Sequence, residues 1–123
     1  MKRIDIQRAA PEQGAALCVL LRDAYRAYAD RGLNLPDVTE GLDAEIAAGR
    51  VWVAIRDGRL LGMLNLSLDR PSAHLVNVAV SPEAKGQGVG GALIRYAIRE
   101  AIKAGCSSLD LATHCDLTEN IKL

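Results

Sequence analysis

A short stretch in the second half of the chain, VAVSPEAKGQGVGGALI (residues 78–94), restricts the fold more than any other segment. An alternating, strand-like run ends in this stretch, and a helical pattern begins directly after a cluster of glycines. The glycines are Gly86, Gly88, Gly90 and Gly91. A glycine-rich loop before a helix exposes backbone N–H groups at the helix N-terminus, where the helix dipole favours an anion. The sequence therefore predicts a mixed α/β domain with an anion-binding loop.

The glycines also match, letter for letter, the G-x-G-x-x-G fingerprint of dinucleotide-binding folds. That fingerprint begins at the end of a strand, whereas here five residues separate Val80 from Gly86. The acid at the expected distance, Asp110, falls within an apolar strand-like run and not at its end. A phosphate-binding P-loop is excluded because no Gly-Lys-Ser/Thr follows the glycines. A nicotinamide-binding fold is therefore the weaker alternative.

Composition narrows the class of protein further. The chain has 123 residues, which predicts one domain over residues 1–123. Lysine and arginine total 15, and so do aspartate and glutamate, so no excess positive charge favours a nucleic-acid partner. No apolar run is long enough to span a membrane, and three cysteines without close spacing indicate neither a disulfide framework nor a metal site. We therefore expect a cytoplasmic protein without a metal.

The pattern of elements predicts an α/β (α+β) fold with a mainly antiparallel sheet flanked by helices. Strands are expected at residues 2–8, 51–56, 60–68, 74–80 and 108–113, and helices at 11–32, 39–48 and 88–104. Asp57-Gly58 between two apolar runs predicts a tight hairpin, because both turn residues need positive φ. The strand at 108–113 follows a helical crossover, which predicts parallel pairing with the strand at 74–80.

Two sets of apolar residues are expected to face the core. The alternation in the strand at 74–80 places Val76, Val78 and Val80 on one face. Helical spacing places one stripe on the helix at 88–104, and burial of each large side chain in it contributes about 1.5–3 kcal/mol. The stripe consists of Leu93, Ile94, Ala97, Ile98, Ala101 and Ile102.

The same stretch resembles motif A of the GNAT superfamily, the acetyl-CoA-dependent N-acetyltransferases. The family loop reads Arg/Gln-x-x-Gly-x-Gly/Ala, and here Lys85, Gly88 and Gly90 stand at its defining positions. Lys85 departs from the usual Arg or Gln, and Ala84 stands where an aromatic residue is common. The resemblance extends to the opening strand and helix and to the hairpin at 51–68, and so covers essentially the whole chain.

The resemblance implies acetyl-CoA as co-substrate and transfer of its acetyl group to a primary amine of an unknown small molecule or peptide. The backbone of Val78 and Val80 would pair with the pantetheine arm, and an N–H at Val78 or Ala79 would polarise the thioester carbonyl. The glycine-rich loop would hold the pyrophosphate. Its implied cofactor-binding residues are Lys85, Gly86, Gln87, Gly88, Val89, Gly90 and Gly91.

Candidate catalytic residues are fewer. Asn77 alternates with Val76 and Val78 and is expected to face the acceptor, which it would orient because an amide is no base. His114 follows the last predicted strand, near the expected position of the thiol, and is a candidate acid or base. His74, at the start of its strand, is a candidate base acting through water.

The C-terminus predicts a departure from the family pattern. Asp116 and Glu119 have the spacing of a capping box and predict a helix start, yet the chain ends at Leu123. In the family this helix often carries a tyrosine that protonates the leaving thiolate, and a hairpin follows. The strand at 108–113 is then expected to be an exposed edge that favours a homodimer. A truncated enzyme, a chain completed by a partner and a non-catalytic CoA-binding or interaction module all stay open.

Overall fold

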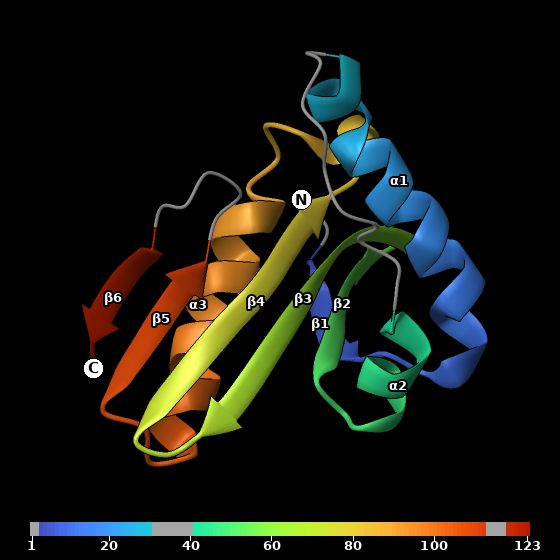
Figure 1. Cartoon of the computed structure of the whole chain (residues 1–123). Coiled ribbons are helices and arrows are strands. Elements are labelled where there is room, and N and C mark those ends of the chain that lie inside the picture. The colour runs from blue at the N-terminus through green and yellow to red at the C-terminus, as the bar shows by residue number, and fades with distance from the viewer. Residues whose placement is uncertain (1–2, 31–40, 113–117) are drawn as a thin grey trace.

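The computed structural model describes residues 3–30, 41–112 and 118–123, and its centre is one mixed sheet. The six strands lie in the order β1-β2-β3-β4-β5-β6, and every neighbouring pair is antiparallel except the parallel pair β4 and β5 (Figure 1). The strands are β1 Asp5–Arg8, β2 Val51–Arg56, β3 Arg59–Asp69, β4 Ser72–Val80, β5 Ser108–Ala112 and β6 Thr118–Lys122. The helices are α1 Gly14–Asp30, α2 Leu42–Ala47 and α3 Val89–Lys103, with short 3-10 turns η1 Pro11–Gln13 and η2 Pro82–Ala84. The predicted mixed fold with a mainly antiparallel sheet is confirmed.

The hairpin of β2 and β3 forms where the sequence predicts it. Asp57 and Gly58 have φ of 55° and 73°, so both turn residues take the left-handed conformation that this tight connection needs. The parallel pairing of β4 with β5 is also present, since α3 carries the chain back across the sheet.

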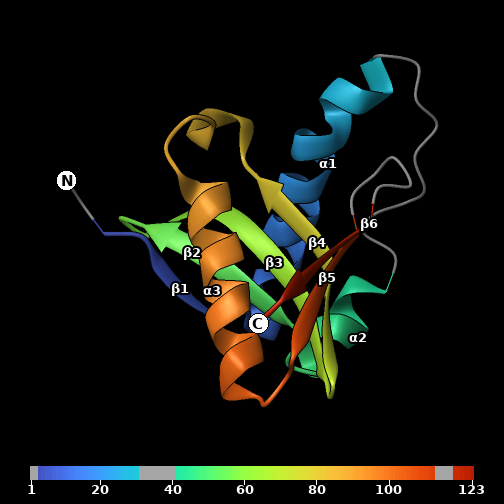
Figure 2. The same cartoon turned by 90° about the vertical axis from the view of Figure 1, so that its left-hand side faces the viewer.

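The sheet separates two layers of helices, with α3 on one face and α1 and α2 on the other (Figure 2). One apolar core fills the space under α3, and it includes Leu64, Leu75, Leu93 and Leu109. A second core lies under α1 and α2 and includes Leu17, Met63 and Ala79.

Close packing of α3 on the sheet depends on a glycine in β3. A Cβ at Gly62 would lie 2.8 Å from the Ala79 carbonyl oxygen and 3.1 Å from side-chain atoms of Leu93 and Val89. A larger residue at this position would push α3, and the loop before it, away from the sheet.

Two predicted core faces need correction. Val76 does not share a face with Val78 and Val80, because the register of β4 against β3 shifts beside it and leaves the Val76 side chain 53% exposed. On α3, Leu93, Ala97 and Ala101 are fully buried as predicted, but Ile102 is 56% exposed. Ile102 lies in the last turn, at the margin of the stripe, and no described strand covers it.

The predicted helix start near the C-terminus is wrong within the described residues. Thr118–Lys122 forms the strand β6, which pairs antiparallel with β5 along its whole length. Five residues cannot nucleate a stable helix alone, whereas the outer side of β5 offers backbone hydrogen-bond partners. The expectation that β5 is the exposed edge is therefore also wrong, since β6 covers it.

Candidate functional site

The candidate site begins with a change of partner along β4. Residues 72–75, the paired half of β4, lie beside β5, and the last matched pair is Leu75 with Leu111. Residues 76–80, the open half of β4, have no counterpart on β5 in the described part of the chain. The change coincides with the register shift against β3, where Asn65 pairs with Asn77 but Leu66 pairs with Leu75. Val76 is thus the extra residue of a β-bulge.

The register shows which backbone groups of the open half are available. Ser81 N–H donates to the Leu61 carbonyl oxygen at 2.8 Å, in the same register that pairs Met63 with Ala79. Hydrogen-bonded pairs alternate along an antiparallel ladder, so Ala79 directs its N–H and C=O toward β3. Val78 and Val80 direct theirs the opposite way. Of the two residues predicted to polarise a carbonyl, only Val78 therefore presents its N–H outward.

The loop after β4 is shaped by two glycines with positive φ. Gly86 has φ of 79° and Gly88, the N-cap of α3, has φ of 82°, while a Cβ on either would meet open space. Their role is therefore conformational, since the left-handed region is costly for other residues.

The backbone donors of this loop converge on the start of α3. In turns of this loop, the Lys85 N–H donates to the Pro82 carbonyl oxygen and the Gln87 N–H donates to that of Ala84. The first intrahelical hydrogen bond of α3 runs from the Ala92 N–H to the Gly88 carbonyl oxygen. Five N–H groups in the loop and the first turn of α3 have no backbone hydrogen-bond partner among the described residues. They belong to Gly86, Gly88, Val89, Gly90 and Gly91. Such a set of donors at a helix N-terminus suits a phosphate group.

The remaining loop residues differ in role. Gly90 lies inside α3 with a Cβ position 3.6 Å from Val80 Cγ2, which is ordinary contact, so backbone conformation does not demand glycine there. The Lys85 side chain is exposed and forms no ion pair with another described residue. It adds positive charge beside the five donors.

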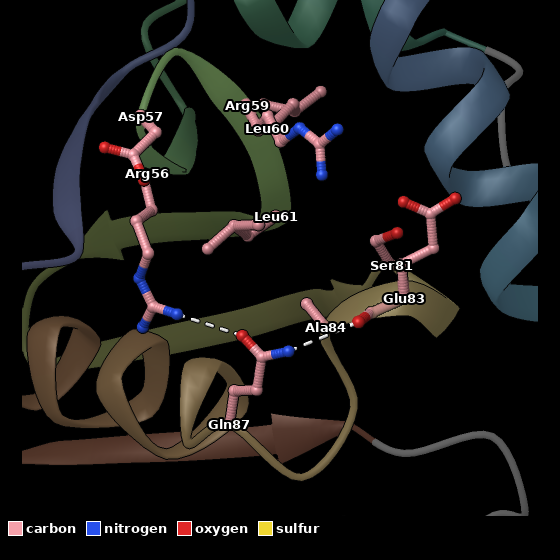
Figure 3. Close-up of a pocket in the computed structure, with 9 residues that line it drawn as sticks. All are labelled: Arg56, Asp57, Arg59, Leu60, Leu61, Ser81, Glu83, Ala84 and Gln87. Carbon is pink, nitrogen blue, oxygen red and sulfur yellow. Dashed lines mark hydrogen bonds between the residues drawn. The ribbon is translucent and has the colours of Figure 1, made fainter. Parts of the chain in front are cut away.

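The Gln87 side chain points toward the β2–β3 hairpin (Figure 3). Its Oε1 accepts a hydrogen bond from Arg56 at 2.9 Å, and its Nε2 donates to the Glu83 carbonyl oxygen at 3.3 Å. The bond with Arg56 ties the loop to the end of β2, and the bond to Glu83 ties it to the η2 turn. A cavity of about 430 Å³ lies beside them, lined by charged and apolar residues of the hairpin and the η2 turn. Neither Val78 nor a glycine of the loop lines this cavity. The cavity therefore lies next to the open half of β4 and is separate from the candidate site.

The predicted catalytic residues are only partly described. Asn77 lies next to the bulge, half-buried, on the face of α1 and α2, and it interacts with another residue. His114 lies outside the described residues. His74 Nδ1, by contrast, lies 3.1 Å from Asp110 Oδ2 across the β4–β5 pair.

Sequence reasoning missed two of these features. The bond from Arg56 to Gln87 and the pairing of His74 with Asp110 each join residues more than thirty positions apart. No local pattern predicts such contacts, because they depend on the strand register. A parallel pairing of the two strands was predicted, but the register that would bring His74 to Asp110 was not.

The comparisons with known proteins identify a family and a fold. Residues 15–123 match the model of a family described as "Acetyltransferase (GNAT) family". No curated protein sequence matches the chain. None of the described helices is long and apolar enough to cross a membrane.

Solved structures share the fold. A GNAT family acetyltransferase from Brucella melitensis in complex with acetyl-CoA is 23% identical, with a TM-score of 0.80 over 100% of this chain and 90% of that one. The PaiA N-acetyltransferase from Thermoplasma acidophilum in complex with coenzyme A is 20% identical, with a TM-score of 0.79 over 92% of this chain and 80% of that one. The N-acetylglutamate synthase from Neisseria gonorrhoeae is 24% identical, with a TM-score of 0.73 over 90% of this chain and 25% of that one.

Proposed function

Because the chain belongs to the acetyltransferase (GNAT) family, we propose that it binds acetyl-CoA and transfers the acetyl group to a primary amine of a small molecule or peptide. The single observation that carries the proposal is the alignment of two sets of free backbone groups. Val78 and Val80 turn their N–H and C=O groups away from β3, and the five loop donors follow directly in the chain.

The dimensions of the open half fit the co-substrate. Its five residues extend over roughly 16 Å at about 3.3 Å per residue, which is close to the reach of an extended pantetheine arm. With the pyrophosphate on the loop donors, the thioester lies near the bulge at Val76, where the pairing of β4 with β5 ends. The backbone of Val78 and Val80 then serves the arm as a neighbouring strand would.

The reaction needs few protein groups beyond this cradle. The Val78 N–H is aimed outward and would donate to the thioester oxygen as negative charge develops there, a contribution of about 2.7–4 kcal/mol for one such donor in other enzymes. The Lys85 side chain and the five loop donors hold the phosphates in place. Asn77 is proposed to orient the acceptor from the face of α1 and α2, and the role of His114 stays a prediction.

Several further expectations accompany this proposal. The two described cysteines, Cys18 and Cys106, are free thiols, which suits the reducing cytoplasm. A single domain over residues 1–123 stays a prediction. So does a homodimer, with β6 in place of β5 as the outermost strand that would meet a second copy.

The test combines binding with turnover. Acetyl-CoA, CoA and NAD are titrated against the 123-residue chain by calorimetry, with oligomeric mass recorded alongside. A panel of polyamines, free amino acids and lysine-containing peptides is then offered with acetyl-CoA, and acetylated amine is detected by mass spectrometry. We expect acetyl-CoA binding without NAD binding, and acetylation of at least one amine. Binding without turnover would favour the non-catalytic module, and NAD binding alone would contradict the proposal.

A further inference from the structure

A titratable pair crosses β4 and β5 close to the proposed position of the thioester. His74 Nδ1 and Asp110 Oδ2 lie 3.1 Å apart, and the side chains are 50% and 34% exposed. The two residues are matched in the parallel register, one position before the last pair, Leu75 with Leu111. His74 therefore lies two residues from the bulge at Val76, about 7 Å along the strand.

The two faces of the sheet differ in how an acceptor can approach. On the α3 face, Leu75 and Leu109 are buried in the core with Leu93, so this side is filled. On the opposite face, no described helix lies over β5 or the paired half of β4, whereas α1 packs against the open half of β4 (Figure 1). His74 and Asp110 are on this second face, since they alternate with Leu75 and Leu109 along their strands. An amine that approaches the thioester along this face from the paired half of β4 meets them.

The surroundings of His74 are acidic and polar. Ser67 is its partner on β3 and donates a hydrogen bond to Asp69 at 2.8 Å. The charge of Asp69 also acts on Arg50, whose pKa is raised chiefly by a hydrogen bond to Glu45 and less by Asp69.

An unused hydrogen-bond acceptor lies on β3, on the same face of the sheet as His74. Asn65 pairs with Asn77 on β4, and its Oδ1 is buried without a hydrogen-bond partner among the described residues. A buried oxygen in this state is costly unless a ligand donates to it. Carboxylates, an imidazole and this oxygen together suit a primary ammonium group.

We propose that His74 takes up, directly or through one water molecule, the proton that the acceptor ammonium loses before it attacks acetyl-CoA, and that Asp110 is its positioning residue. The inference rests on the proposed function and assigns its proton acceptor. With Nδ1–H donating to Asp110, the imidazole presents Nε2 as the base, and the carboxylate stabilises the imidazolium that forms.

The proton balance is complete without another reactant. The ammonium gives one proton to His74, and the neutral amine nitrogen forms a bond to the acetyl carbon. The bond between this carbon and sulfur breaks, and the second nitrogen proton ends on the departing thiolate, which gives free CoA. His74 then returns its proton to solvent.

The test uses the 123-residue chain and the best amine of the panel. His74→Gln is expected to lower kcat/KM about 10²-fold or more at neutral pH and to remove the acidic limb of the pH profile, while the acetyl-CoA affinity stays within twofold. Asp110→Asn is expected to lower kcat/KM by a smaller factor. Ser72→Ala is the matched control, because its hydroxyl lies 2.9 Å from that of Ser108 on the same face, farther from the bulge.

A second acceptor separates proton transfer from a structural role. An aromatic amine or an acyl hydrazide is already neutral at pH 7, so its acetylation should fall less than tenfold in His74→Gln. An equal loss for both kinds of acceptor, or a variant with the rate and pH profile of the wild type, would overturn the role of His74. A wild-type chain that acetylates no amine of the panel would overturn the proposed function, and this role with it.

Discussion

The two halves of β4 belong to one strand but meet different neighbours. The paired half, residues 72–75, has β3 on one side and β5 on the other, and its side chains Ala73 and Leu75 are in the α3 core. The open half, residues 76–80, pairs with β3 on one side and with no other strand among the described residues. A single extra residue, Val76, lies at the boundary.

This difference teaches how one strand can serve stability and binding at once. In the paired half the backbone hydrogen bonds are satisfied within the sheet, so substitutions there should change the free energy of unfolding. In the open half the outward backbone groups of Val78 and Val80 would bind the proposed co-substrate, so substitutions there should change turnover. The following predictions test this division.

The largest expected effect lies in the paired half, at the boundary. Leu75 is 5% exposed and Val76, its neighbour, is 53% exposed. Leu75→Ala should lower the free energy of unfolding by about 2–5 kcal/mol, because it leaves a cavity under α3. Val76→Ala should change it by about 0.5 kcal/mol or less. Urea denaturation measures both free energies of unfolding, and equal losses in the two variants would contradict a boundary between the two halves of β4 at Val76.

The next prediction removes one backbone donor without removing a side-chain function. Val78→Pro deletes an N–H that faces away from β3, so the fold should survive while kcat falls about 10²–10³-fold, or about 2.7–4 kcal/mol. Ala79→Pro deletes an N–H that pairs with β3 and should instead destabilise the chain by about 3 kcal/mol. If both variants lose stability alike, the inferred direction of these N–H groups is incorrect.

A feature of the fold or of the candidate site can be predicted from the sequence when neighbouring residues in the chain determine it. Asp57 and Gly58 fix the hairpin by their own conformations, and Gly88 and Gly105 bound α3 in the same way. The β2–β3 hairpin and α3 were therefore predicted almost to the residue. The anion-binding nature of the loop also follows from local chemistry, since glycine positions determine which backbone groups are exposed.

The features that were missed depend on partners distant in the sequence. The bulge at Val76 arises from the register of β4 against β3, which alternation alone cannot reveal. The strand β6 forms because β5 offers it an edge, although the capping-box spacing of Asp116 and Glu119 favours a helix. The contact of His74 with Asp110 likewise depends on the register across a helical crossover.

A smaller effect is expected from a pair of glycines in the loop. Gly88 needs its φ of 82°, so Gly88→Ala should cost about 1–2 kcal/mol in strain and weaken acetyl-CoA binding. Gly90 is helical, and its Cβ would make only ordinary contact with Val80, so Gly90→Ala should leave stability within about 1 kcal/mol of the wild type. Calorimetric titration and thermal unfolding measure the two quantities. Similar behaviour of the two variants would contradict a conformational role for Gly88.

The smallest expected effect concerns the charge beside the loop. Lys85 is exposed before the five donors, whereas Lys103 is exposed at the opposite end of α3. Lys85→Gln should weaken acetyl-CoA binding by about 0.2–1 kcal/mol, because the lost attraction to the phosphates is screened by solvent. Lys103→Gln should have no measurable effect. Raising the salt concentration to about 1 M, where the screening length is about 3 Å, should remove most of the difference between the variants. A difference that persists at high salt would mean that Lys85 acts by a direct, desolvated contact, and the proposed acetyl-CoA site would then depend on a side chain as well as on backbone groups.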